Sequence, residues 1–288
     1  NSDKVDGVAN DSKFTVGTQN TTYDNDGSKN ISVVTKDSSI KNEVSKMDEG
    51  EKITVPVKGQ AELSKGIFSV QSIKDMQKKD LVLEVQTDTA TYELQTDLID
   101  VNAISKEIGK DIALSDIEFS VEIAKTNDKM VEVVKDATKK DELTIVVPPM
   151  DFQINANYNE KSYEIKKFDA FVTRRIEIPS KEEANKITTA IITEPDGSIR
   201  HIPTYVTEID GKYYATINSL TNSTYTLINN EAIFSDVPET HWAKADIEKM
   251  ASRLVVGGNE DGTFFPDEAI TRSEMAEILV KALGLNPN

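Results

Sequence analysis

Short runs of alternating apolar and polar residues, separated by turn formers, occupy the middle of the chain from residue 52 to about residue 230. Such alternation is typical of half-buried β-strands. Residues 81–86 and 91–94 predict one strand pair around a turn. The same pattern predicts further strands at 117–123, 143–147, 152–156, 163–165, 171–178 and 224–228.

Turn signals within this region predict how some of the strands connect. Asp-Gly pairs at 196–197 and 210–211 predict two tight hairpins, because Asp-Gly favours the turns that suit twisted strand pairs. Pro148 and Pro149 predict a break between two strands, since proline cannot donate to a sheet ladder.

Helical periodicity interrupts the strand pattern at 101–108 and at 127–139, where Met130, Val134 and Ala137 share one face. Strands with a few inserted helices indicate the α+β class. We therefore expect residues 51–231 to form one α+β module, most of it a β-sandwich. Residues 1–50 are poor in aromatic residues and are expected to be a flexible or partly ordered lead-in, or the frayed end of another β-domain.

The last part of the chain, residues 232–288, changes to an all-α pattern of helix, loop and helix. Thr271 with Glu274 predicts a capping box at the second helix, and Gly284 predicts its end. Two apolar stripes at helical spacing carry this prediction: Ala243, Ile247, Met250, Ala251 and Leu254, then Met275, Ile278, Leu279, Ala282 and Leu283. So small a unit buries little surface, so we expect it to need neighbours.

Composition excludes several classes of partner. The formal net charge of −17 argues against nucleic acid and against acidic membrane surfaces, both of which attract clustered Lys and Arg. The apolar runs are of strand length, so no membrane insertion is expected. There is no cysteine, so neither disulfides nor thiolate metal sites are expected. The run at 23–28 resembles a calcium loop only superficially and is predicted to be a plain turn.

Catalytic chemistry has few candidate residues, and we expect no enzyme, no cofactor and no metal. His201 lies in an alternating strand, where it is predicted to be a strand-surface residue, and His201 with His241 makes no zinc ligand set. The chain contains neither a nucleophile elbow nor a phosphate-binding Gly-rich loop. Carboxylate pairs are unavoidable among 50 acidic residues, so a wall-attached glycoside hydrolase fragment remains an alternative.

Four motifs in the last part of the chain occur in a fixed order: Phe-x-Asp-Val at 234–237, His-Trp-Ala at 241–243, a Gly-rich loop at 257–267 and Ile-Thr-Arg-Ser-Glu at 270–274. This order resembles the S-layer homology (SLH) domain of Gram-positive-type bacterial surface proteins. The segment before it resembles the β-rich segment that often precedes SLH repeats.

The resemblance implies a partner and a mode of assembly. SLH domains usually occur as three tandem copies, which bind pyruvylated secondary cell-wall polysaccharide in grooves between copies. One copy has half of each groove, so we expect either further copies in the same chain or three chains in association. A polyanionic polymer is repelled by an acidic chain, so binding must rest on local basic residues or bridging cations.

Five residues are candidate carbohydrate ligands by this resemblance: Asp236, Trp242, Gly258, Arg272 and Glu274. Arg272 leads, because a guanidinium can bind a pyruvate carboxylate with two parallel hydrogen bonds. Alternatives stay open: Trp242 as core, Asp236 as a cap of the first helix, and Gly258 as a turn residue with positive φ.

The leading hypothesis is therefore a secreted protein of the cell wall or S-layer, anchored non-covalently through the SLH-like domain, with the β-module as spacer or assembly contact. The alternatives are a self-association module that binds no carbohydrate and a fragment of a wall-attached hydrolase.

Overall fold

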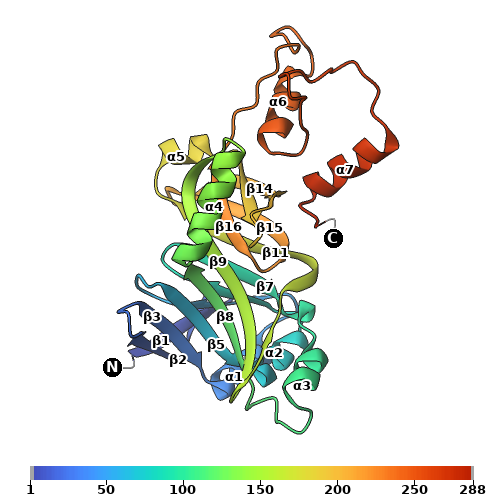
Figure 1. The fold of residues 1–288 in the computed structure, drawn as a ribbon. Coiled ribbons are helices and arrows are strands. Elements are labelled where there is room, and N and C mark those ends of the chain that lie inside the picture. Colours follow the sequence, from blue (N-terminus) through green and yellow to red (C-terminus); the bar gives the residue numbers. More distant parts are fainter. Residues whose placement is uncertain (1–2, 287–288) are drawn as a thin grey trace. The chain divides into compact units, whose positions relative to one another are not determined.

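The computed structural model describes residues 3–286 and divides the chain into two compact units. The first unit holds the chain up to Lys125, Met150–Ile176 and Leu220–Ser223. The second holds Thr126–Pro149, Glu177–Ser219 and the chain from Thr224 onward. The predicted α+β class is confirmed, with a β-rich part followed by the helices of the C-terminal region (Figure 1).

The first unit is a strongly curved sheet with helices at one edge. Its helical elements are α1 (Asp37–Lys46), α2 (Val70–Gln77), the 3-10 turn η1 (Thr96–Leu98) and α3 (Val101–Ile108). Its strands are β1 (Asp3–Ala9), β2 (Ser12–Tyr23), β3 (Lys29–Thr35), β4 (Lys52–Pro56), β5 (Leu63–Ser69), β6 (Val82–Gln86), β7 (Ala90–Gln95), β8 (Glu118–Lys125) and β10 (Lys161–Glu164), with parts of β9 (Thr144–Tyr158) and β11 (Lys167–Ile178).

The strand order in this unit is β10-β9-β8-β5-β3-β2-β1-β4-β6-β7-β11. The sheet curls over its own interior, because a Cβ added to Gly66 on β5 would lie 2.7 Å from Val85 on β6, although four strands separate β5 from β6 in the ladder. The rings of Tyr92 and Phe152 also meet inside, with their centroids 6.0 Å apart. Most of the large buried apolar side chains among residues 3–286 belong to this unit.

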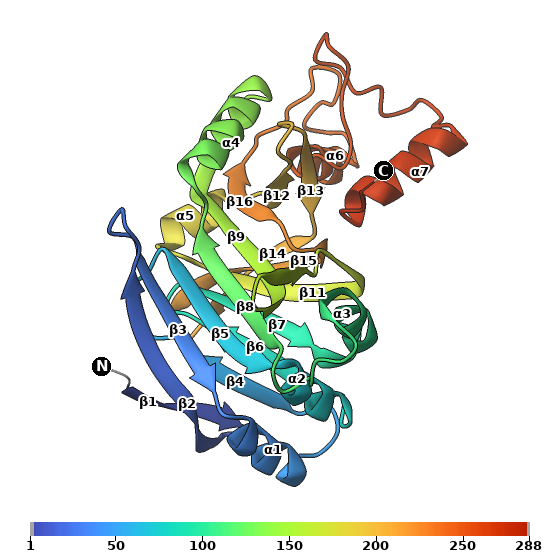
Figure 2. The same cartoon turned by 60° about the horizontal axis from the view of Figure 1, so that its bottom comes forward.

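A parallel strand pair explains where the first two helices lie. β3 pairs in parallel with β5, so both strands end on the same side. The helices α1 and α2, which follow these strands, therefore begin there and lie side by side (Figure 2). Asp37 at the start of α1 accepts hydrogen bonds from Ser69 Oγ (2.7 Å) and Ser72 Oγ (2.9 Å) at the start of α2. The two helix starts therefore stabilise each other.

The structure of residues 3–46 differs from the expected lead-in. They form β1, β2, β3 and α1, with β1 paired to β4 and β3 paired to β5. The sequence pattern missed these strands because few of their residues are large and apolar, and they are held by partners from beyond residue 50.

The second unit contains α4 (Asp128–Lys140), α5 (Lys181–Lys186), β12 (Thr189–Thr193), β13 (Ile199–Ile202), β14 (Thr204–Ile209), β15 (Lys212–Thr221), β16 (Thr224–Asn229), α6 (Lys244–Ser252) and α7 (Arg272–Ala282), with the first part of β9. β12 lies between β13 and β16, and β14 pairs with β15. Both hairpins predicted from Asp-Gly are confirmed. The predicted helices at 101–108 and 127–139 correspond to α3 and α4, whereas α1, α2 and α5 were missed.

The predicted break at Pro148 and Pro149 is wrong, because β9 runs through both prolines. Pairing with β8 begins only at Met150, opposite Lys125. The prolines therefore lie where β8 requires no backbone N–H donor from β9, a position at which a strand tolerates proline.

Candidate functional site

The C-terminal region builds a small core around α6. Phe234, Val237 and Ala251 are buried together, with Ile247 and Phe264 packed against them. The rings of Phe234 and Phe264 lie 5.1 Å apart at an interplanar angle of 42°. One aromatic residue of the Gly-rich loop, Phe264, therefore packs on the core around the first helix.

Asp236 holds the Gly-rich loop onto this core. Its two carboxylate oxygens accept hydrogen bonds from the backbone N–H groups of Phe264 (2.8 Å) and Phe265 (2.7 Å). Burial raises the pKa of Asp236, but these N–H groups outweigh it and lower the pKa below its usual value. The alternative that Asp236 caps the first helix is wrong, because the N-cap of α6 is Ala243, which makes no side-chain cap bond.

Gly258 owes its identity to close packing. A Cβ at this position would lie 2.3 Å from Phe234 Cε1 and 2.8 Å from the carbonyl oxygen of Thr263, so no other residue fits without displacing the ring. Its φ is not in the left-handed region, so the interpretation that a turn requires positive φ here is wrong. The glycine is exposed on its other side, which leaves its backbone accessible.

Trp242 projects into solvent. Its side chain is 88% exposed and stacks on the ring of His241, with centroids 6.0 Å apart and planes at 28°. The alternative that Trp242 is a core residue is therefore wrong in this structure. The small core has its aromatic content from Phe234 and Phe264 instead, so the indole face is free to contact a ligand.

The start of α7 places Arg272 in solvent beside a complete capping box. Thr271 Oγ1 accepts from the Glu274 N–H (3.2 Å), while a Glu274 carboxylate oxygen accepts from the Thr271 N–H (2.6 Å) and hydroxyl (2.8 Å). These bonds lower the pKa of Glu274, the backbone N–H of Thr271 contributing most. Arg272 is exposed, and within residues 3–286 it forms no ion pair or hydrogen bond.

A shallow cavity of about 390 Å³ lies between the Gly-rich loop and α7. Gly258 and Glu274 both line it, together with Phe265 and Ile270. Asp236 accepts a hydrogen bond from the backbone N–H of Phe265. The structure thus places two of the five candidate residues, Gly258 and Glu274, in the lining of one depression, which Asp236 does not line. Trp242 and Arg272 are not among the residues that line it.

None of the residues of α7 is buried. Its apolar residues Met275 and Leu279 are 45% and 50% exposed, Leu283 just after the helix is 46% exposed, and Ile270 just before the helix is 58% exposed. The second helix therefore does not pack on the first as a closed pair, and it contacts β13 instead. The expectation that this unit needs neighbours agrees with so much exposed apolar surface.

His201 on β13 is buried, so its predicted place on the strand surface is wrong. It is 5% exposed, and its Nδ1 lies 2.7 Å from the hydroxyl of Thr189. Burial, helped by the positive charge of Arg253, lowers the pKa of His201 to about 4, although the backbone carbonyl of Ala282 acts in the opposite direction. The ring is therefore neutral near pH 7, and alternation alone could not show that α7 covers it.

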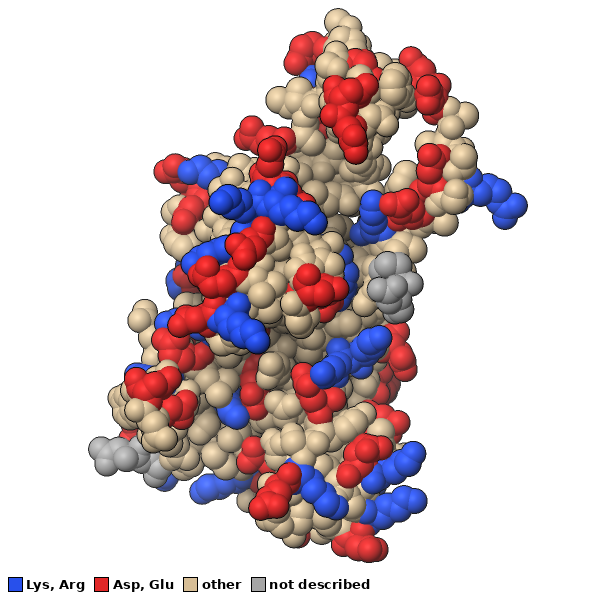
Figure 3. Space-filling view, in the orientation of Figure 1, with Lys and Arg blue, Asp and Glu red and all other residues tan. Residues whose placement is uncertain are grey.

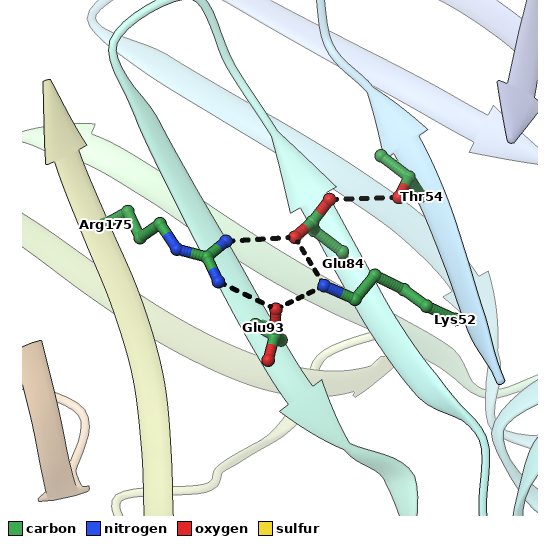
Figure 4. A network of polar contacts seen from close by, with 5 residues as sticks. All are labelled: Lys52, Thr54, Glu84, Glu93 and Arg175. Carbon is green, nitrogen blue, oxygen red and sulfur yellow. Dashed lines mark hydrogen bonds and ion pairs between the residues drawn. The ribbon is translucent and has the colours of Figure 1, made fainter. Parts of the chain in front are cut away.

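One facing pair of carboxylates occurs on the outer side of the sheet in the first unit (Figure 4). Glu84 and Glu93 lie opposite each other on β6 and β7, and both bind Lys52 and Arg175 at distances of 2.5–3.4 Å. Burial raises the pKa of Glu93, but its bonds to Lys52 and then the charge of Arg175 lower the pKa below its usual value. Glu93 is thus held ionised, which does not suit a proton donor for glycoside hydrolysis.

Further observations on residues 3–286 concern metal binding, membrane spans and charge. No group of three or more His, Cys, Asp or Glu side chains there could hold a metal ion. No described helix is both long enough and apolar enough to span a membrane. Residues 23–28 form a turn in which Asp26 Oδ1 accepts from the Ser28 N–H (2.9 Å). On the face shown in Figure 3, acidic and basic side chains are interspersed without a basic concentration.

Comparison with known proteins bears on the same region. Residues 233–276 match the S-layer homology domain family. The chain is 40% identical over 55 residues to the cellulosome-anchoring protein of Acetivibrio thermocellus, which covers 19% of this chain and 12% of that protein. It is 40% identical over 52 residues to S-layer protein EA1 of Bacillus anthracis and 42% identical over 52 residues to outer membrane protein SlpA of Thermus thermophilus, in each case 18% of this chain and 6% of the relative. No solved structure matches.

Proposed function

Since this chain carries an S-layer homology domain, which surface-layer and cellulosome-anchoring proteins share, we propose that it belongs to a secreted, cell-wall-associated protein that this domain anchors non-covalently to secondary cell-wall polysaccharide. The chain spans about an eighth or less of the length of these relatives, so the proposal concerns the anchoring region. The relatives are structural or anchoring proteins by name, which supports a non-enzymatic role.

The exposed guanidinium of Arg272, which has no partner among the described residues, is the observation that carries the carbohydrate proposal. It projects from the first turn of α7, where its positive charge opposes the helix dipole and gains nothing from a protein partner among the described residues. An unpaired guanidinium in that position suits an anionic ligand, and the pyruvate carboxylate of a wall polysaccharide is such a ligand. Trp242 supplies an exposed indole face, which suits the apolar face of a sugar ring.

Asp236, Gly258 and Glu274 complete the proposed binding surface with different roles. Each has a structural function in the fold: Asp236 holds the loop, Gly258 makes room for Phe234, and Glu274 caps α7. We propose that their remaining exposed atoms contact sugar hydroxyls along the cavity of about 390 Å³. The exposed apolar residues of α7 support association with further SLH copies, in the same chain or in trans as a trimer.

Arg272→Ala tests the anchoring proposal in the 288-residue chain. We expect its affinity for purified cell walls to fall about tenfold or more, the loss typical of one charge-assisted bidentate contact. The measurement is a wall pull-down before and after the non-peptidoglycan polymer is extracted. Lys249→Ala is the matched control, because it removes an exposed positive charge from α6 of the same domain.

Three results would contradict the proposal: equal binding to extracted walls, equal losses for Arg272→Ala and Lys249→Ala, or no binding by the unaltered chain. Self-association without carbohydrate is the second candidate, favoured by the exposed face of α7. It predicts that the chain's oligomeric mass in light scattering depends on Leu279 and does not change when the polysaccharide is added.

A further inference from the structure

The position of α7 poses a physical problem, because hydrophobic burial does not hold it. The helix has eleven residues, and none of them is buried. Isolated helices of that length are marginal in water, and most helix stability in proteins comes from packing of an apolar face. The interactions at the two ends of α7 must therefore provide most of what keeps it folded and in place.

The C-terminal end is closed by a tight hydrogen-bonded turn. Gly284 adopts the left-handed conformation (φ +64°), its N–H donates to the Lys281 carbonyl (2.9 Å), and the Leu285 N–H donates to the Val280 carbonyl (3.0 Å). This is the arrangement of a Schellman cap. It leaves the carbonyl groups of Ala282 and Gly284 at the very end of the helix available to outside donors.

Side chains of the β12–β13 hairpin provide these donors. Arg200 Nη1 donates to the Gly284 carbonyl (3.2 Å), while its Nη2 contacts a Glu194 carboxylate oxygen (3.3 Å). The Arg200 side chain is only 16% exposed, so this contact is well enclosed. His201, the next residue, faces the Ala282 carbonyl. A guanidinium beside a helix C-terminus is also favoured by the helix dipole.

Gly284 itself lies against the strand in a way that only glycine permits. A Cβ there would lie 2.8 Å from Pro203 Cδ, 3.0 Å from the His201 carbonyl oxygen and 3.1 Å from Ile202 Cδ1. Substitution would therefore force the end of α7 off β13, quite apart from the strain of a left-handed φ.

The rest of the helix stands away from the hairpin. A cavity of about 910 Å³ opens between them, lined by Ala276 and Val280 on α7 and by Pro195 and Ile199 on the hairpin side. The contact is therefore concentrated at one end of the helix. Because its other end carries Arg272, a small change at the clamp would swing the guanidinium through a large displacement.

We propose that the β12–β13 hairpin is a docking platform for the SLH domain, in which Arg200, His201 and Gly284 form a clamp that sets the direction of α7. The clamp presents Arg272 at the start of α7 in one orientation to wall polysaccharide. Preorganisation of this kind strengthens binding because less conformational freedom is lost on association. The effect of the clamp on wall binding rests on the proposed anchoring function. The existence of the clamp can be tested without that function.

Hydrogen exchange of α7 amides in the 288-residue chain tests the clamp directly. We expect Gly284→Ala and Arg200→Ala to accelerate exchange in residues 272–286 by about tenfold, because local opening becomes easier. Gly211→Ala is the matched control, since Gly211 has a similar φ (+77°) but no atom within 4 Å of an added Cβ. Arg200→Lys should restore much of the protection, because the ammonium can still donate to the Gly284 carbonyl.

Wall binding by the same variants tests the consequence. We expect both clamp variants to bind purified walls several-fold more weakly, with Gly211→Ala unchanged. Unchanged α7 exchange in Gly284→Ala and Arg200→Ala would overturn the clamp. Faster exchange with unchanged binding would overturn its role in presentation and leave the anchoring function intact. If the unaltered chain fails to bind walls, the anchoring function is wrong, while the exchange result still decides whether the clamp exists.

Discussion

Helices α2, with eight residues, and α7, with eleven, hold their places in opposite ways. α2 begins with a Ser69 cap and buries Val70, Ile73 and Met76 completely under the first unit's sheet. α7 begins with a stronger cap, the Thr271–Glu274 box, and buries no residue. The first helix belongs to a hydrophobic core, whereas the second is fixed at its ends and leaves its side chains exposed. The difference leaves the surface of α7 available to a partner.

The largest expected effect is the difference in the free energy of unfolding that is lost when an apolar side chain is shortened in α2 or in α7. Ile73→Ala should lower the free energy of unfolding by about 2–5 kcal/mol, because it opens a cavity in a packed core. Leu279→Ala should change it by less than about 0.5 kcal/mol, because that side chain is half exposed. Urea unfolding of both variants at low protein concentration measures the difference. A large loss for Leu279→Ala would mean that the α7 face is already covered, through association of chains.

The second effect concerns pH and the buried histidine beneath α7. His201 has a folded pKa of about 4 against an ordinary value of 6.5, so the unfolded chain takes up its proton first. Its contribution to stability is complete above pH 6.5 and is lost as pH falls towards 4, a loss of roughly 3 kcal/mol over that window. Arg253 adds to the cost of charging the ring.

A variant without a titrating ring isolates this effect from the carboxylates, such as Asp236 and Glu274, that also lose stabilising contacts in acid. The free energy of unfolding of His201→Gln should fall less steeply than that of the unaltered chain between pH 6.5 and 4. Chemical denaturation across this range, with hydrogen exchange to assign the response to the second unit, provides the measurement. Parallel curves for the two proteins would contradict the burial of His201.

The smallest expected effect compares the two helix caps. Thr271→Ala and Ser69→Ala each remove a side-chain acceptor from a helix N-terminus, a change worth about 1 kcal/mol. In α2 the loss should appear in global unfolding, because the core holds the helix until the unit unfolds. In α7 it should appear only as faster local hydrogen exchange. Equal global losses would show that α7 unfolds together with a hydrophobic core.

Features encoded by a few neighbouring residues were predictable from the sequence. The capping box of α7, its end at Gly284 and the two Asp-Gly hairpins all appear as expected. The motifs in the last part of the chain also identified the SLH domain. Their signals are local, since each depends on backbone conformation and hydrogen bonds within a few residues.

Features that depend on what packs from elsewhere were not predictable. Trp242 was as suitable for a core as for a surface, and His201 lay in an alternating pattern that is normally half exposed. Gly258 turned out to make room for Phe234, which lies 24 positions away in the sequence. Arg200 gave no signal at all, because its role arises only when the end of α7 meets β13.

By itself the sequence determined the fold class, the SLH domain and the local geometry that begins and ends α7. Only the tertiary structure decided that residues 3–46 join the first sheet, that β9 passes through two prolines, and that α7 rests on the hairpin by its end. The physical reason is that caps and turns are satisfied by adjacent residues, whereas burial and strand pairing depend on partners that only the folded chain brings together.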